Sequence, residues 1–146
     1  MRRILHALLL LLLAGCGSGL VVDTYPTASD TDADCKALYA DGAQKVAGQK
    51  QVLVKGQKAT AWGDPAIILR CGVMAPDDLE PTSRCDLVAG VGWFTEEIAD
   101  GYLFTTIGRR FFVSLEVPSS YDPPADALVD VAPSVIKHDP VVKPCV

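Results

Sequence analysis

Acidic side chains at two points of the chain could form a hydrolytic site. Asp64 stands in the turn signal Gly63-Asp64-Pro65, and Glu96 and Glu97 follow an apolar stretch. Glycan-cleaving enzymes place two carboxylates about 5 to 9 Å apart. Aspartate before proline is also an ordinary turn residue, and adjacent glutamates are typical of a solvated bend. We therefore expect no catalytic residues, and the alternative function is a cell-wall hydrolase or transferase that uses Asp64 with Glu96 or Glu97.

Two tryptophans and two arginines could make a binding surface. A tryptophan near a strand end can present a flat face to a sugar ring or an apolar partner, and arginine supplies hydrogen-bond donors. Trp93 alternates with apolar residues, which predicts a place in the core, whereas Trp62 in its turn fits a core and a surface position equally well. The candidate binding residues are Trp62, Asp64, Arg70 and Arg109.

The amino terminus has the pattern of an export signal. Two arginines precede an almost unbroken apolar stretch over residues 4–13, and Leu13-Ala14-Gly15-Cys16 follows at once. This stretch is too short for a helix that spans a bilayer, which needs about 20 apolar residues. The order Leu-Ala-Gly-Cys resembles the lipobox of bacterial lipoproteins. It implies removal of residues 1–15 and a thioether that joins Cys16 to diacylglycerol.

Such an anchor predicts an extracytoplasmic protein on the outer face of the cell membrane, where acyl chains contribute about 0.8 kcal/mol per buried methylene. The chain has 13 basic and 18 acidic residues, and the leader removes two of the basic ones, which leaves 11 against 18. Because no basic stripe offsets this negative charge, nucleic acid is excluded as a partner. We expect contact with the membrane through the lipid, and an envelope protein or cell-wall component as a further partner.

Five cysteines become an even set once Cys16 is assigned to lipid. The other four, in an oxidising compartment, are expected to form two disulfides, for which three pairings are open. The short, turn-rich connection between Cys71 and Cys85 favours that pair, which leaves Cys35 for Cys145. Zinc is the other use of four cysteines, but the sequence has no Cys-x-x-Cys pair. We expect no metal and no cofactor, apart from the covalent diacylglycerol at Cys16.

The pattern after Cys16 separates a linker from one domain. Ser, Thr, Gly, Asp and Pro are frequent in residues 16–30, which predicts a flexible tether behind the lipid. A capping pattern and the spacing of apolar residues predict a first helix over residues 31–48. A second helix is expected between Asp122 and Pro140, with a kink or a break at Pro133.

Apolar runs separated by turn residues predict strands between the two helices. The run over 66–73 contains one charge, Arg70, and suits a central strand. The expected strands cover residues 51–55, 66–73, 86–94, 102–107 and 111–117, the last two as a hairpin. Residues 31–146 therefore indicate one two-layer α+β domain, with a mostly antiparallel four- to five-stranded sheet and an N-terminal and a C-terminal helix packed on one face.

Three short motifs carry a family resemblance: Trp62-Gly63-Asp64-Pro65, Leu69-Arg70-Cys71-Gly72-Val73 and Val91-Gly92-Trp93-Phe94. Together they resemble an actinobacterial family of secreted proteins and lipoproteins classed as a domain of unknown function. The resemblance implies a cell-envelope setting and brings no known activity with it. We therefore expect a membrane-anchored lipoprotein with a noncatalytic binding or structural role in the cell envelope.

Overall fold

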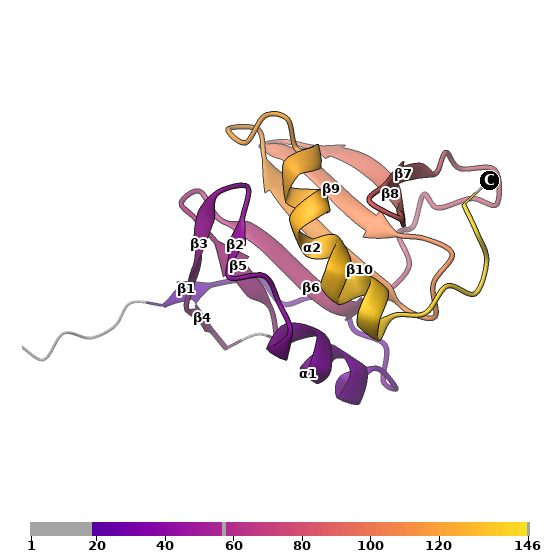
Figure 1. Ribbon diagram of the computed structural model, residues 1–146, viewed down its shortest axis with the longest axis horizontal. Helices are drawn as coiled ribbons and strands as arrows, with labels where there is room; N and C mark the ends of the chain where they lie inside the picture. The colour runs from indigo at the N-terminus through magenta and orange to yellow at the C-terminus, as the bar shows by residue number, and fades with distance from the viewer. Residues whose placement is uncertain (1–18, 57, 146) are drawn as a thin grey trace, which may run out of the picture.

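An eight-stranded antiparallel sheet forms the centre of the protein (Figure 1). The computed structural model describes residues 19–56 and 58–145. The predicted combination of two helices with an antiparallel sheet is confirmed, but the sheet has eight strands rather than four or five. Its strands, in spatial order, are β2 (Lys45–Val46), β3 (Gln49–Val52), β5 (Thr60–Trp62), β6 (Ile67–Val73), β10 (Phe112–Pro118), β9 (Gly101–Thr106), β8 (Val91–Ile98) and β7 (Asp86–Val88).

Two tight turns account for part of this difference. Ala47 and Gly48 have φ angles of 46° and 75°, and Ala89 and Gly90 have φ angles of 47° and 81°. Positive φ at both central residues is typical of two-residue hairpin turns, whose twist matches that of the strands. The first turn joins β2 to β3, so the first helix, α1 (Asp32–Ala40), is shorter than the predicted 31–48. The second turn divides the predicted strand 86–94 into β7 and β8.

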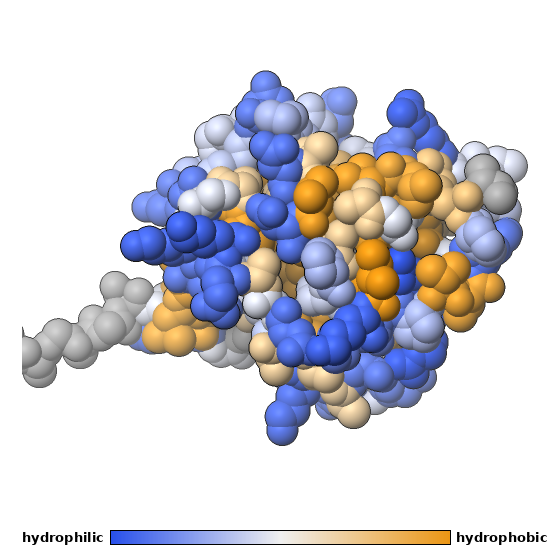
Figure 2. All heavy atoms as spheres, in the orientation of Figure 1, coloured by the Kyte–Doolittle hydropathy of each residue, from blue (hydrophilic) through white to orange (hydrophobic). Residues whose placement is uncertain are grey.

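The second helix, α2 (Ala125–His138), lies across one face of the sheet (Figure 1). It continues through Pro133, so the helix is not divided where a kink or a break was expected. Proline leaves the carbonyl four residues earlier without its helical partner. That carbonyl belongs to Val129, which is exposed like Pro133, so water can satisfy it. Figure 2 shows hydrophobic surface in the region that α2 occupies in Figure 1.

The core lies between the sheet and the two helices. Alternate residues of the central strands, such as Leu69 of β6 and Leu115 of β10, are buried in one cluster with Leu38 of α1 and Val131 of α2. Burial of a side chain of this size stabilises the fold by about 1.5 to 3 kcal/mol. Because successive residues of a strand point to opposite faces, Arg70 lies on the face of β6 away from the helices.

The segment before α1 is packed against the domain, which corrects the predicted flexible tether over the described residues 19–30. The strand β1 (Leu20–Val21) pairs in parallel with β4 (Val54–Lys55), and Val22 is buried. Further along, the Ala28 amide donates to the Gly72 carbonyl at 2.8 Å. Burial of an apolar side chain and pairing of backbone groups outweigh the loop-like composition on which the prediction depended.

Candidate binding site

Arg70 is the predicted binding residue that the structure places beside a cavity. Its side chain is 8% exposed, and its Nη1 donates to Glu116 Oε2 at 3.0 Å. The guanidinium also lies over the ring of Tyr25, with Cζ 4.8 Å from the ring centroid. The Nε of Arg70 is buried and has no hydrogen-bond partner among the described residues. Glu116 and Tyr25 therefore hold the guanidinium in place while one of its donors stays unused.

The cavity beside Arg70 has a volume of about 260 Å³. Tyr25 and Thr27 of the N-terminal segment line it together with Lys58, Asp23 and Arg70. Pockets that enclose drug-sized ligands measure about 300 to 1,000 Å³, so this one suits a single group of a larger molecule. Both cationic side chains of the lining already have a carboxylate partner, since Arg70 is paired with Glu116 and Lys58 with Asp32. A guanidinium donor prefers a carboxylate or phosphate oxygen. We refer to this feature as the Arg70 cavity.

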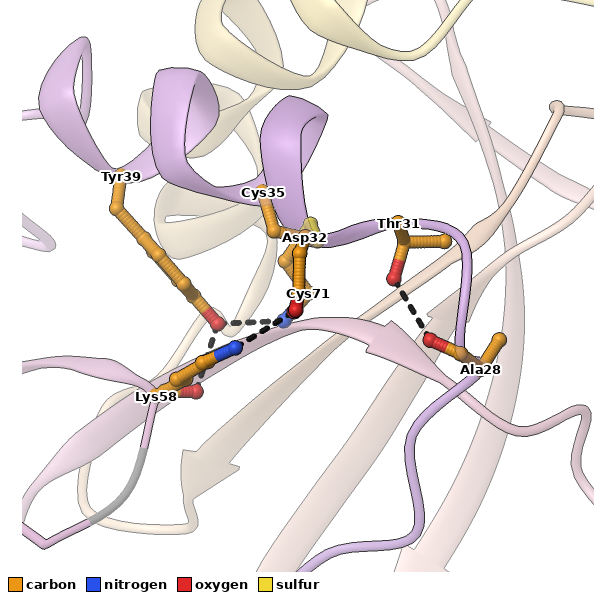
Figure 3. Close-up of polar contacts among 7 residues, drawn as sticks. All are labelled: Ala28, Thr31, Asp32, Cys35, Tyr39, Lys58 and Cys71. Atoms are coloured by element: carbon orange, nitrogen blue, oxygen red, sulfur yellow. Dashed lines mark hydrogen bonds and ion pairs between the residues drawn. A yellow bond between two sulfur atoms is a disulfide. The ribbon is translucent and has the colours of Figure 1, made fainter.

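Tyr39 of α1 contacts Lys58 and Cys71, two residues that line the Arg70 cavity (Figure 3). Its hydroxyl accepts a hydrogen bond from the Cys71 amide at 2.8 Å and donates one to the Lys58 carbonyl at 2.7 Å. Burial raises the pKa of Tyr39, so the hydroxyl keeps the proton that it donates. The Lys58 amine is paired with Asp32 at 2.6 Å. Both the backbone and the side chain of Lys58 are thereby held next to α1.

The disulfides correct the favoured pairing of the cysteines. Cys35 is bonded to Cys71, with Cα atoms 5.5 Å apart, and Cys85 is bonded to Cys145, with Cα atoms 5.8 Å apart. The favoured pair of Cys71 with Cys85 was wrong because the two side chains lie on opposite faces of the sheet. Cys71 points toward α1, whereas Cys85 and Cys145 lie against the helix-free side of Gly92, where a Cβ would come within 2.7 Å of the Cys85 sulfur.

Both tryptophans lie in the core. Trp62 is 1% exposed and belongs to strand β5 instead of a turn, and its Nε1 donates to the Ala43 carbonyl at 2.8 Å. Trp93 is 0% exposed, in agreement with its alternation. Neither ring has a face that could stack on a sugar or an apolar partner. Asp64 is exposed in the connection between β5 and β6 and does not line the Arg70 cavity.

A family model described as a protein of unknown function, DUF3515, matches residues 16–143. The chain belongs to the DUF3515 family. The expected membership of a family of unknown function is therefore confirmed over almost the whole chain. No curated protein matches the chain, and no solved structure matches it.

The DUF3515 sheet keeps the two candidate catalytic carboxylates apart. Across the strands, Ile68 of β6 is aligned with Glu116, Glu116 with Leu103, and Leu103 with Glu96 of β8. These three strand spacings amount to roughly 14 Å, and Asp64 lies beyond the end of β6. Burial, followed by the charges of Asp78 and Asp77, raises the pKa of Glu96. The acidic neighbours of Glu96 therefore come from the 74–85 connection and not from Asp64.

Arg109 has a structural place in the DUF3515 domain. The residue is 8% exposed, and its guanidinium donates from Nη1 to the Asp139 carbonyl and from Nη2 to the Gly90 carbonyl at 3.1 Å. The Asp139 carboxylate accepts hydrogen bonds from the amides of Arg110 and Phe111 at 3.0 and 3.2 Å. Burial raises the pKa of Asp139 to about 6. This cluster joins the end of α2 to the segment before β10, and Arg109 does not line the Arg70 cavity.

A second cavity, of about 350 Å³, was not predicted from the sequence. The 74–85 connection and the C-terminal tail form it over Phe112 and Ile107, beside the disulfide of Cys85 with Cys145. Its walls come from segments about 60 residues apart, so no local pattern indicates it. Among the described residues, no group of His, Cys, Asp and Glu could hold a metal ion, and no helix is long and apolar enough to cross a membrane.

Proposed function

We propose that this protein is an actinobacterial lipoprotein, anchored through Cys16 to the outer face of the cell membrane, with a noncatalytic binding or structural role in the envelope. Cys16 and the apolar leader lie outside the described residues. The leader pattern and the Leu-Ala-Gly-Cys motif support the anchor, and the family match begins at Cys16, directly after the predicted leader.

The pairing of the other four cysteines is the observation that carries the proposal. The two disulfides, Cys35–Cys71 and Cys85–Cys145, use all the cysteines of the described chain. None of these four is therefore left to form a disulfide with Cys16, whose thiol we assign to lipid. Structural disulfides form and persist in oxidising compartments. The chain-entropy estimate gives about 4 kcal/mol of stabilisation for each ring of this size. A domain that depends on two such bonds suits the outer side of the membrane.

The Arg70 cavity is the place where we expect the binding role to reside. It combines a buried guanidinium stacked on Tyr25, the Lys58 side chain and a volume of limited size. These features favour an acidic group that projects from a larger envelope molecule. The alternative of a cell-wall hydrolase or transferase that uses Asp64 with Glu96 or Glu97 loses support. Both glutamates lie on β8, three strand spacings from β6, and Asp64 precedes β6, so the separation exceeds the spacing that a carboxylate pair needs.

The anchor is tested by labelling cells with radioactive palmitate. The wild-type protein is expected to take up label, and Cys16→Ala is expected to take up none and to keep its uncleaved leader. Mass mapping of the nonreduced protein should give peptides that join Cys35 to Cys71 and Cys85 to Cys145. Absence of label in the wild type, or equal label in Cys16→Ala, contradicts the anchor.

The binding role is tested with a photo-crosslinking residue at Thr27, which is exposed and lines the Arg70 cavity. Leu87 is the control position, because it is 65% exposed and does not line this cavity. We expect a crosslinked species in intact cells from position 27 that is lost with Arg70→Gln and absent from position 87. Equal crosslinking from both positions argues against binding at the Arg70 cavity.

A further inference from the structure

A small ribbon separate from the main sheet stands where the described chain begins. In it, β1 pairs in parallel with β4, and the Leu20 amide donates to the Leu53 carbonyl at 2.7 Å. Two large apolar side chains on this ribbon face solvent: Val21 is 78% exposed and Leu53 is 68% exposed. Figure 2 shows hydrophobic surface at this end of the molecule. Two exposed apolar side chains on one small ribbon make it a candidate contact surface.

The ribbon lies within a short reach of Cys16. Two residues lie between Cys16 and Gly19, so three residue steps join them. A fully extended chain covers at most about 3.6 Å per residue, and the two Cα atoms are therefore no more than about 11 Å apart. Headgroups occupy roughly 5 to 7 Å on each side of the hydrocarbon layer. A thioether to diacylglycerol at Cys16 therefore brings the ribbon to the headgroup layer.

The segment that contains β4 is basic although the chain as a whole is acidic, whereas the exposed Asp23 follows β1 on the other side of the ribbon. The sequence from residue 45 to residue 58 contains four lysines and no acidic residue, although the chain carries a formal net charge of −5. Among the described residues Lys58 is paired with Asp32, whereas Lys45, Lys50 and Lys55 are exposed and make no ion pair. Lysines beside exposed apolar side chains are typical of surfaces that bind anionic lipid.

From these observations we infer that the β1–β4 ribbon is the membrane-docking surface of the domain, with Val21 and Leu53 at the interface and Lys55 of β4 on an anionic headgroup. This inference rests on the proposed anchor at Cys16. The partner of the ribbon is the lipid surface, because the chain between Cys16 and Gly19 is too short for the ribbon to stand away from the bilayer. The acidic remainder of the domain then faces away from the membrane.

The test uses the lipidated protein in vesicles of phosphatidylglycerol and phosphatidylcholine with brominated acyl chains, which quench nearby tryptophan emission. Leu53→Trp places a reporter on the ribbon, and Leu87→Trp is a matched control, because these leucines are 68% and 65% exposed. Trp62 and Trp93 are buried and give the same background in every variant. We expect brominated lipid to reduce the additional emission of Leu53→Trp at least twofold and to leave that of Leu87→Trp unchanged.

Mass spectrometry of the acyl chains, together with the quenching measurement, distinguishes a wrong docking surface from a wrong anchor. If mass spectrometry shows acyl chains on the protein but the Leu53→Trp emission is not quenched, the docking surface is wrong and the lipoprotein assignment stands. Stronger quenching of Leu87→Trp also overturns it. If the protein carries no acyl chains, the proposed anchor fails first, and with it the reason for placing the ribbon at the membrane. If brominated lipid quenches the Leu53→Trp emission less as the protein concentration rises, the ribbon contacts a protein partner, and this result contradicts the inference.

Discussion

The guanidinium of Arg109 donates to the backbone carbonyl of Asp139 at the point where α2 ends. The carboxylate of Asp139 in turn accepts the amides of Arg110 and Phe111, which precede β10. One aspartate thus receives hydrogen bonds at both its backbone and its side chain from a single neighbouring segment. Because α2 covers the core, this contact closes the end of the hydrophobic layer with a buried carboxylate.

Replacement of Asp139 by asparagine is expected to weaken the dependence of stability on pH. Burial raises the pKa of Asp139 to about 6 in the folded protein, above the ordinary value of 3.8. Between these values the folded state binds more protons than the unfolded state, so this group lowers the free energy of unfolding as the pH rises. From about pH 5 to about pH 7.5, wild type should lose roughly 1 kcal/mol of unfolding free energy relative to Asp139→Asn.

Urea unfolding of both proteins at these two pH values measures this difference. Asparagine keeps an oxygen that can accept the amides of Arg110 and Phe111, so the variant isolates the charge of Asp139. Equal pH dependence in the two proteins would show that the carboxylate of Asp139 is not shifted in the folded state.

Removal of the Tyr39 hydroxyl is expected to destabilise the protein by about 1 to 3 kcal/mol. Tyr39→Phe leaves the amide of the buried residue Cys71 without its acceptor, and an unsatisfied buried donor carries the cost of its lost hydration. Tyr121→Phe is the control, because the hydroxyl of Tyr121 donates to the carbonyl of the exposed Pro65, which water can replace. The urea midpoint should fall clearly further in Tyr39→Phe, and similar midpoints would contradict the role of Tyr39 as a buried support.

The two buried tryptophans should differ in how much they tolerate phenylalanine. Both are almost fully buried, but only the Trp62 indole has a hydrogen-bond partner among the described residues, the Ala43 carbonyl at 2.8 Å. Trp62→Phe and Trp93→Phe each lose volume in the core. Only the first also removes a hydrogen bond, so it should cost about 1 kcal/mol more in the free energy of unfolding. A larger loss for Trp93→Phe would contradict this assignment.

Local patterns predicted the elements whose apolar residues repeat with helix or strand spacing inside one continuous segment. The apolar run of β6, the hairpin of β9 with β10 and the amphipathic α2 were all expected near their observed places. The sequence missed the hairpin turns at Ala47-Gly48 and Ala89-Gly90, since alanine rarely takes a positive φ. The prediction for residues 19–30 depended on composition alone. Composition does not show that Val22 is buried or that the Ala28 amide donates to a carbonyl of the domain.

For the candidate site, the sequence named Arg70 as a possible donor but not the cavity around it. That cavity requires Tyr25, Lys58 and Arg70 to meet, and these residues come from three separate segments. The same limit applies to Trp62, whose surroundings include the Ala43 carbonyl at the end of the α1 region. Residue type indicates what a side chain can do, whereas only its neighbours determine whether a ligand can reach it.

By itself, the sequence determined the α+β composition of the domain, the even set of four cysteines and the residues available for chemistry. The tertiary structure alone decided which cysteines bond, that Trp62 is inaccessible, that Asp64 and Glu96 are separated and that the N-terminal segment lies on the domain. The reason is physical. Helix and strand patterns arise from neighbours along the chain, whereas pairing, burial and reach depend on which face of the sheet each segment covers, and that is settled by contacts between distant residues such as Cys85 and Cys145, 60 positions apart.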